Sequence, residues 1–406
     1  MSGLGGFILA LLLLAAFLRV DFFHYLFYLT VGIVVLGRWW AQRAARAVTY
    51  RREYPERVFW GERPTVRLEV CNKGYLPVLW LRIHDSLPIE LSSPNFFHRV
   101  LSLWPRERVT LTYPLDCRRR GYYLLGPLAL EAGDLLGTTR VSLSREDAST
   151  VVVYPRIIPL SQLGLPSRTP YGSIRSKQRI FEDPSRVLGV RDYAPGDSLR
   201  HVAWKTSAIV GRLQVKRYQP AIALDTTILL DLDRADYSQM RVYVASELAI
   251  VLAASLANWL VEHRQAVGLC TNGQDPLAEE GQDGRREYGT LLEPRKGRGA
   301  LVRILDLLAR IQLTEGQDFA ALLQRQTGRL PWGSTLAIVT GRVGDALFPA
   351  LAGLRRAGFS VVLYSVDPST AFEAIRRRAA LIGVASYQVW EEADLEHGVL
   401  AVGRQP

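Results

Sequence analysis

The first 40 residues constrain this chain more than any other feature. Residues 3–18 read GLGGFILALLLLAAFL without a single charge, and residues 22–40 read FFHYLFYLTVGIVVLGRWW with one arginine. A membrane-spanning helix needs about 20 apolar residues, so the second segment is long enough and the first is slightly short. We therefore expect residues 1–46 to form a transmembrane helical hairpin with spans at about 3–18 and 22–40.

Basic residues after the second segment predict its orientation. They are Arg38, Arg43, Arg46, Arg51 and Arg52. Positive charges next to a span favour the cytoplasmic side, so we expect a protein of the cell membrane whose soluble body is cytoplasmic. A cleaved signal peptide is the alternative. It is disfavoured because Met1-Ser2-Gly3 carries no basic residue and no small-x-small cleavage site precedes a polar mature start.

The remaining sequence divides into three segments by its periodicity. Residues 50–156 alternate apolar and polar positions between Gly, Pro and Asn turn signals, which predicts a β-sandwich. Residues 157–220 are polar, basic and irregular, and we expect a connecting segment with one short helix. Residues 221–406 alternate short apolar strands with longer apolar-striped helices, which predicts a Rossmann-like α/β domain with a mainly parallel sheet. Ligands of such sheets bind at the carboxyl ends of the strands.

The most distinctive stretch is RDYAPGDSLRHVAWKTSAIVGRLQVK at residues 191–216. Asp197 follows a Pro-Gly turn and is expected to cap a helix that runs to about Val210 and ends at Gly211. Trp204 is expected to pack inward. The basic side chains of this stretch would bind an acidic partner or brace a domain interface; they are Arg191, Arg200, Lys205 and Arg212. A capped helix that only docks one domain on another is the competing interpretation.

These residues resemble the signature of the "domain of unknown function 58" family. The matching positions are Arg191, Tyr193, Pro195, Gly196, Asp197, Arg200, Trp204, Ser207, Ala208, Gly211, Arg212 and Leu213. Upstream, Arg120-Gly121-Tyr122, Leu125-Gly126-Pro127 and Val153-Tyr154-Pro155 match as well, whereas Asp134-Leu135-Leu136-Gly137 stands where the family has Asp-Pro-Phe-Gly.

The resemblance implies a bacterial membrane protein with a von Willebrand A-like C-terminal domain. Genes of the family often neighbour MoxR-type AAA+ ATPases, so such an ATPase is the partner that the resemblance implies. We expect the partner to bind the signature positions, namely Arg191, Tyr193, Pro195, Gly196, Asp197, Arg200, Trp204, Lys205, Ser207, Gly211 and Arg212.

The same resemblance raises the question of a metal. Von Willebrand A domains often hold a divalent cation with Asp-x-Ser-x-Ser after the first strand, together with a Thr and an Asp from later loops. Here the run is Asp231-Leu232-Asp233-Arg234-Ala235, and Gly341-Arg342 stands where the later Asp is expected. We expect a degenerate site near Thr340 whose carboxylates pair with Arg234 or Arg342, and a protein without a cofactor. Alternatively, the clustered carboxylates of Asp231, Asp233 and Asp236 bind Mg²⁺ weakly, with Asp231 and Asp233 as the remaining ligands.

Catalytic motifs are missing from the sequence: it has no Gly-x-Ser-x-Gly elbow, Walker loop or His-Glu-x-x-His helix. His201 and Ser207 are six positions apart and would point to different faces of one helix, which makes a poor triad with Asp197. The formal charge of +11 and pI of about 9.7 raise nucleic-acid binding, but the arginines beside the membrane span explain part of that charge. The three cysteines have no zinc or disulfide spacing.

The sequence therefore predicts a membrane-anchored cytosolic interaction or scaffold protein that is not an enzyme, with no nucleic acid and no small-molecule substrate. A metal-dependent enzyme or adhesion module that uses Asp231 is the alternative.

Overall fold

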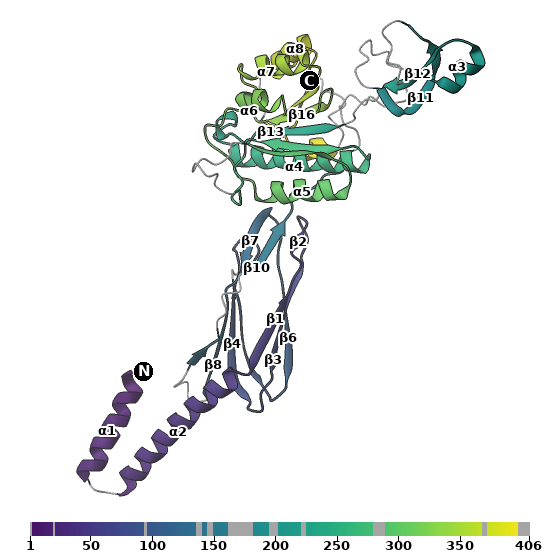
Figure 1. Ribbon diagram of the computed structural model, residues 1–406. Coiled ribbons are helices and arrows are strands. Elements are labelled where there is room, and N and C mark those ends of the chain that lie inside the picture. The colour runs from purple at the N-terminus through teal and green to yellow at the C-terminus, as the bar shows by residue number, and fades with distance from the viewer. Residues whose placement is uncertain are drawn as a thin grey trace. The chain divides into compact units, whose positions relative to one another are not determined.

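The computed structural model divides the chain into two compact units (Figure 1). One unit comprises Met1–Arg156 with Leu305–Ile311, and the other comprises Ile157–Ile304 with Gln312–Pro406. The structure describes residues 2–18, 21–92, 96–134, 140–143, 149–160, 182–194, 202–220, 225–278, 289–367 and 372–396.

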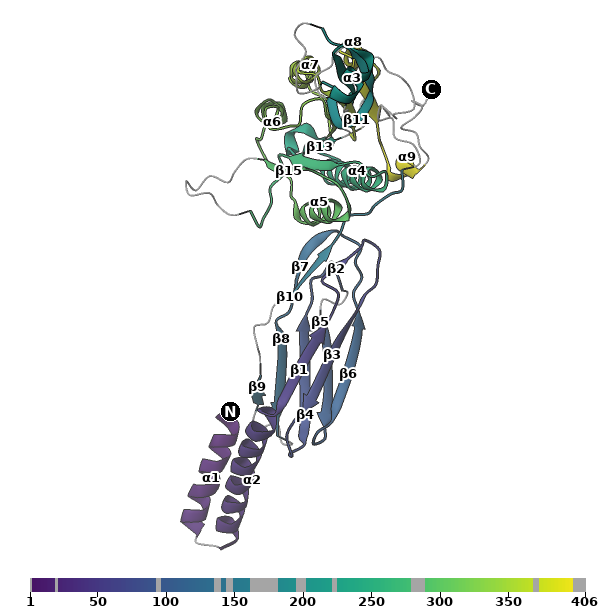
Figure 2. The same ribbon diagram turned by 45° about the vertical axis from the view of Figure 1, so that its right-hand side comes forward.

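Two apolar helices open the first unit. Helix α1 (Ser2–Leu18) and helix α2 (Asp21–Ala45) lie side by side (Figures 1 and 2). Helix α2 has 25 residues and contains an 18-residue stretch with a mean hydropathy of 1.3, which by length and composition is enough to cross a membrane, and α1 has 17 residues. Large apolar side chains of α2 are exposed, for example Phe22 at 64% and Leu36 at 60%.

The β domain consists of short strands in three small sheets. Its strands are β1 (Val48–Glu53), β2 (Arg57–Val58), β3 (Thr65–Asn72), β4 (Val78–Ser86), β5 (Phe96–Leu103), β6 (Arg108–Pro114), β7 (Gly121–Leu125), β8 (Leu128–Gly133), β9 (Arg140–Ser142) and β10 (Ser149–Val153). The sheet orders are β1-β3-β6, β5-β4-β8-β9 and β2-β10-β7, and every pair except β2–β10 is antiparallel.

One buried cluster joins the first two sheets and the end of α2. Strand β3 alternates buried and more exposed positions, as a strand with one face on a core must. The cluster contains Ala44 and Ala45 of α2, Leu68 and Val70 of β3, Leu81 and Ile83 of β4, and Leu128 and Leu130 of β8. Helix α2 therefore runs without a linker into the β domain, and its last turn is part of the core.

A buried ion pair ties β1 to the opposite sheet. The Arg52 side chain is 5% exposed and Asp85 is fully buried, and Arg52 Nη1 lies 2.9 Å and 3.1 Å from the two Asp85 carboxylate oxygens. Arg52 Nη2 donates to Leu125 O at 3.2 Å and to Ser149 Oγ at 2.9 Å. The Tyr113 hydroxyl also donates to Asp85, and burial together with that carboxylate raises the pKa of Tyr113, so the phenol stays protonated.

The connecting segment is more regular than expected. Strand β11 (Glu182–Asp192) pairs antiparallel with β12 (Gln214–Pro220), and helix α3 (Trp204–Val210) lies between them in sequence. The expectation of an irregular segment was wrong for these residues, and α3 is one short helix within the described part of the segment. Register shifts near Gly189 interrupt the alternation that would have marked the strands.

The second unit contains a six-stranded sheet in the order β15-β14-β13-β16-β17-β18. Its elements are β13 (Thr226–Leu230), the short helix η2 (Arg234–Asp236), α4 (Val242–Glu262), β14 (Val267–Thr271), β15 (Thr290–Arg295), α5 (Arg298–Arg310), α6 (Phe319–Gln326), β16 (Thr335–Thr340), α7 (Leu347–Arg356), β17 (Ser360–Ser365), α8 (Phe372–Leu381), β18 (Ala385–Gln388) and α9 (Glu392–Glu396). The expected mainly parallel sheet is confirmed; β15, which pairs antiparallel with β14, was not anticipated.

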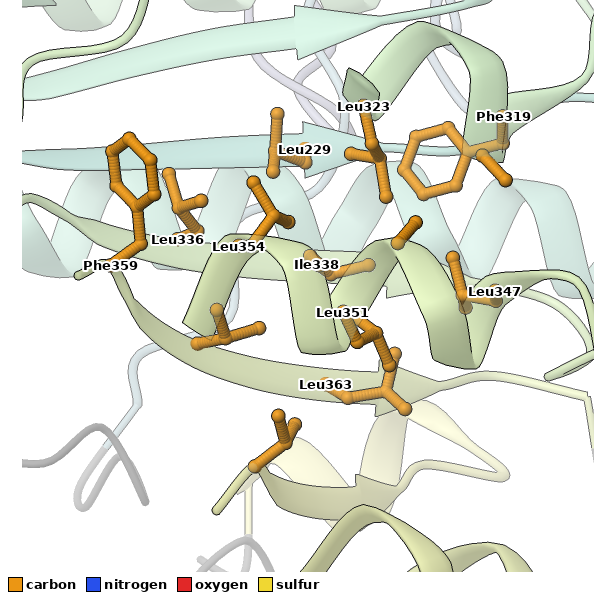
Figure 3. Close-up of a cluster of buried hydrophobic side chains, with 14 of the residues drawn as sticks. Leu229, Phe319, Leu323, Leu336, Ile338, Leu347, Leu351, Leu354, Phe359 and Leu363 are labelled. Atoms are coloured by element: carbon orange, nitrogen blue, oxygen red, sulfur yellow. The ribbon is translucent and has the colours of Figure 1, made fainter. Parts of the chain in front are cut away.

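Helices cover both faces of this sheet. Helices α6 and α7 pack on one face through the cluster shown in Figure 3, in which Leu323 and Leu351 meet Leu229, Ile338 and Leu363 of the strands. Helix α4 lies against the other face (Figure 1). It is apolar enough to span a membrane, but 72% of its apolar stretch is buried, so it is a core helix.

Candidate functional site

The first candidate site lies at the carboxyl edge of the parallel sheet. Asp231 follows β13, Asn272 follows β14, Thr340 ends β16 and Asp367 comes two residues after β17. Their exposed fractions are only 1–2%. Parallel strands present their carboxyl ends at the same edge, which is why four segments distant in sequence supply polar side chains to one place.

The Asp231 carboxylate accepts hydrogen bonds at both oxygens. Oδ1 accepts from Asn272 Nδ2 at 2.8 Å and from the backbone N–H of Asp233 at 3.0 Å, and Oδ2 accepts from Thr340 Oγ1 at 2.7 Å. Asn272 Oδ1 in turn accepts from the Leu232 N–H at 2.6 Å. The sheet edge thus satisfies this buried carboxyl group with its own donors.

The loop after β13 folds tightly over this group. Tyr237 donates its hydroxyl to the Asp231 carbonyl at 2.6 Å, and the Arg342 N–H donates to the Asp236 carbonyl at 2.6 Å. A Cβ on Gly341 would come within 2.3 Å of that Asp236 oxygen and 2.7 Å of the Tyr237 ring. Glycine is required at position 341 because the neighbouring Asp236 carbonyl and Tyr237 ring leave no room for a side chain.

Burial changes the ionisation of this site. Desolvation, and then the charge of Asp236, raises the pKa of the Asp231 carboxyl to about 8, although its hydrogen bonds oppose that shift. Desolvation raises the pKa of Asp236 as well, and Asp236 is hydrogen-bonded to Asp231. The raised pKa of Asp231 and of Asp236 favours the protonated form of each carboxyl group. This pair of neighbours therefore retains a proton near neutral pH.

Arg342 and Arg234 form ion pairs with carboxylates other than those of Asp231 and Asp233. Arg342 Nε lies 3.2 Å from Asp367 Oδ2, which also accepts from the Ser238 N–H at 2.7 Å, and Arg234 Nη1 lies 3.0 Å from Glu315. The expectation that Arg234 or Arg342 neutralises the Asp231 or Asp233 carboxylate was wrong. Asn272, Tyr237 and Asp367 were missed, although Asn272 and Asp367 follow apolar strands and could have been found by that rule.

The residues at this edge do not fit a divalent metal ion. Mg²⁺ requires near-octahedral oxygen ligands with exchangeable positions. Both Asp231 oxygens are engaged, Asp233 Oδ1 accepts from the N–H groups of Ala235 at 3.1 Å and Gly316 at 3.3 Å, and Ala235 itself has no ligand atom. Among the residues that the structure describes, no group of three His, Cys, Asp or Glu side chains is arranged to hold a metal.

The second candidate site is the surface around α3. Its exposed apolar side chains are Val190, Trp204, Ile209, Val210 and Leu213, and its basic side chains are Arg191, Lys205, Arg212 and Lys216. We call these nine residues the α3 surface. Trp204 is 66% exposed and Ile209 78% exposed. Asp192 is the one acidic residue within the described stretches 189–194 and 202–216, and it lies 3.8 Å from Arg212.

The signature helix differs from its expected form at its start. It begins at Trp204 with Ala203 at the cap position and no side-chain cap, so a helix running from Asp197 was wrong. Pro195, Gly196, Asp197, Arg200 and His201 lie outside the described residues. The cap at Gly211 is confirmed: its φ is 70° and its N–H donates to Ser207 O at 3.0 Å.

Inward packing of Trp204 was also wrong, because Ser207 occupies the buried face of α3. Ser207 Oγ donates to Ala203 O at 3.0 Å and accepts from the Gln214 N–H at 2.8 Å. The Ala203 N–H donates to Gln214 O, and the Tyr193 N–H donates to Leu213 O. These bonds hold α3 on β12 and leave the face with Trp204 and Ile209 without a partner in the described structure.

Comparisons with known proteins give one family and distant structural neighbours. Residues 189–312 match the family described as "Protein of unknown function DUF58". The "Uncharacterized protein YeaD" of Bacillus subtilis (strain 168) is 25% identical over 237 residues, and the match covers 57% of each chain. A von Willebrand factor type A protein from Catenulispora acidiphila shares 10% identity over 46% of this chain and 43% of that chain, with a TM-score of 0.32. A CARDB domain from Pyrococcus furiosus shares 20% identity over 26% of this chain and 86% of that chain, with a TM-score of 0.20.

The matched segment begins in β11 and includes α3, β12, Asp231 and Asn272, whereas Thr340 and Asp367 of the same edge lie beyond it. The resemblance drawn from the signature residues is thereby confirmed, and the chain is related to the DUF58 family through residues 189–312.

Proposed function

We propose that this protein is a membrane-anchored scaffold that binds a protein partner through the α3 surface. The observation that carries the proposal is the exposure of Trp204 and Ile209 inside the segment that matches the family. Tryptophan is enriched among the residues that dominate binding energy at interfaces. Large apolar side chains left exposed to water, where they form a patch, mark interaction sites in soluble proteins.

The charge of the α3 surface indicates the kind of partner. The α3 surface includes four basic residues, Arg191, Lys205, Arg212 and Lys216, and Asp192 is the one acidic residue within the described stretches 189–194 and 202–216. A matching partner would present an apolar patch with acidic residues at its rim, because complementary potentials favour encounter and orientation. The partner we propose is a MoxR-type AAA+ ATPase, as the family resemblance implies.

Anchoring belongs to the same proposal. Helix α2 is long and apolar enough to span, and its exposed phenylalanines and leucines would be stabilised by lipid rather than by water. We propose that α1 and α2 form a two-span hairpin, that the basic residues after α2 lie in the cytoplasm and that the α/β domain is of the von Willebrand A kind. A reagent added outside the cell that labels neither a probe at Ser2 nor a probe at Glu53 would support two spans. Labelling of the Ser2 probe alone would indicate a single span.

Co-purification from native membranes tests the partner. Wild-type protein should retain the ATPase, whereas Trp204→Ala should lower retention by about tenfold or more, since interface tryptophans contribute at least about 2 kcal/mol. Lys205→Glu should weaken binding most at low salt. Trp390→Ala is the matched control, because Trp390 is 50% exposed but lies outside the α3 surface. Equal retention by Trp204→Ala and the control would refute the role of this surface.

A binding role is proposed here in preference to a catalytic one. At the Asp231 edge both carboxylate oxygens accept hydrogen bonds from protein donors, which favours a structural role for this group. Hydrolase activity of the purified protein that disappears in Asp231→Ala would favour an enzyme instead.

A further inference from the structure

Two loops of the β domain lie at the end where α2 enters. Strand β1 begins where β3 ends, with Val48 opposite Asn72, and β4 begins where β5 ends, with Val78 opposite Leu103. The loops at 73–77 and 104–107 therefore share this end of the domain with the C-terminus of α2. Asn72 joins them, because its Nδ2 lies 2.9 Å from Leu76 O and 3.2 Å from Trp104 O.

Direct contacts fix these loops along α2. The Lys73 N–H donates to Ala47 O at 2.9 Å, and Trp40 Nε1 donates to Pro77 O at 3.1 Å. Farther back along the helix, a Cβ on Gly37 would lie 3.3 Å from Asp134 Oδ2. The β domain thus contacts α2 from residue 37 onward, over about 15 Å of helix at 1.5 Å per residue.

The membrane boundary on α2 falls at the same level. A span that begins at Asp21 crosses a hydrocarbon core of about 30 Å in roughly 20 residues, which ends it at Trp40. Pro77 contacts Trp40, so the 73–77 loop lies where the lipid headgroups begin. This step rests on the membrane anchoring of α2 proposed above.

The exposed side chains of the two loops suit a headgroup layer. Tyr75 is 79% exposed and Trp104 is 68% exposed, although both are large aromatic residues. The Arg106 guanidinium lies 4.9 Å from the Tyr75 ring centre, and its Nη2 donates to the Tyr75 hydroxyl at 3.0 Å. Tyrosine and tryptophan are enriched at membrane interfaces, where one end of the ring is apolar and the other is hydrated.

The charge at this end is positive. Its basic side chains are Arg43, Arg46, Lys73 and Arg106, all exposed. Its acidic side chains are Asp134, which is buried beside Gly37, and Glu107, whose carboxylate accepts from the Trp104 N–H at 2.6 Å, so four exposed positive charges stand against these two carboxylates. Each basic residue near an anionic bilayer contributes about 1 kcal/mol of attraction. Charge complementarity therefore favours an anionic lipid surface over a neutral one.

We propose that the loops 73–77 and 104–107 form a second membrane contact, in which Tyr75 and Trp104 enter the headgroup layer of an anionic bilayer. With the rigid entry of α2, this contact holds the β domain in one orientation against the membrane. The β domain is then held at a fixed distance from the membrane and does not move freely about the end of α2.

Depth-dependent quenching tests the contact with the full chain in lipid nanodiscs. The discs contain phosphatidylglycerol and phosphatidylcholine, with or without bromine on the upper part of the acyl chains. The emission of Trp104 is obtained by subtracting the emission spectrum of Trp104→Phe from that of the wild type. This subtraction removes the emission of the tryptophans in α2. Trp60→Phe is the matched control, because Trp60 is 41% exposed in the same domain but lies at the opposite end, where its Nε1 donates to Arg118 O.

We expect bromine to lower the Trp104 emission by about twofold in anionic discs, and by less in neutral discs, with no effect on Trp60. Unquenched Trp104 in discs that quench the α2 tryptophans would overturn the contact while leaving the anchor intact. Equal quenching in neutral and anionic discs would overturn its electrostatic basis. Quenching that vanishes when a protein partner is added at saturating amounts would assign the surface to that partner and overturn the proposal. A chain that does not enter discs at all would instead refute the anchoring of the proposed function.

Discussion

Replacing Arg52 by methionine tests how the β domain holds the strand that follows α2. The substitution leaves the Asp85 carboxylate fully buried and without its ion pair, while the Tyr113 hydroxyl still donates to it. Removing one partner of a buried ion pair typically costs about 3–5 kcal/mol, because the remaining charge is uncompensated. Arg51→Met is the matched control. Arg51 is the neighbouring residue and pairs with Glu53, but these side chains are 76% and 53% exposed, so the loss should be at most about 1 kcal/mol.

Hydrogen exchange read by mass spectrometry measures this difference locally, which avoids treating a chain of two compact units as two-state. Amides of β1 and β4 should exchange more than about a hundredfold faster in Arg52→Met, and less than about tenfold faster in Arg51→Met. The double variant Arg52→Met with Asp85→Leu should recover part of the loss, since apolar replacements of a whole pair are often neutral. Equal exchange in the two single variants, or a double variant no better than Arg52→Met, would refute the reasoning.

Three further predictions concern the α/β domain. The raised pKa of Asp231 means that the folded state holds a proton that the unfolded state releases, so stability should fall as pH rises from about 4 to 8, at most about 1.4 kcal/mol per pH unit. Melting temperatures of Asp231→Asn should lack most of that slope, and parallel profiles would contradict the shift. Gly341→Ala should lower stability by at least about 1–3 kcal/mol because its Cβ meets Asp236 O, whereas Gly344→Ala, with nothing within 4 Å, should be close to neutral in the same melts. Calorimetric titration with Mg²⁺ or Mn²⁺ should show no saturable binding; an isotherm abolished by Asp231→Ala would overturn the assignment of a site without metal.

The sequence predicts the regular elements of this chain well where burial is uniform. TTILL at 226–230 is buried at all five positions, and the long α4 pattern is equally plain, so apolar runs marked both. Strand β15 was missed because TLLEPR includes a proline and lies at the sheet edge, where partial exposure weakens the pattern. Strands β11 and β12 were missed because polar residues and register shifts leave little alternation.

The candidate sites were predictable only in part. Asp231 and Thr340 were predicted from the rule that ligands of parallel sheets bind at the carboxyl ends of the strands. The structure adds that the two side chains are hydrogen-bonded to each other. No local pattern indicated that Tyr237 would fold over the site, because that contact depends on the close approach that Gly341 permits. The orientation of Trp204 was wrong for a similar reason. A helix of seven residues has one narrow buried face, and hydrogen bonds to β12 place Ser207 on it.

The proposed protein partner on the α3 surface is tested most directly by a titration of the purified MoxR-type ATPase onto the full chain in nanodiscs. Wild type, Trp204→Ala and Trp390→Ala are compared at one salt concentration. We expect saturable binding whose Kd rises by about tenfold or more in Trp204→Ala and stays unchanged in Trp390→Ala. Binding that is absent in the wild type, or equal in all three proteins, would contradict the proposal.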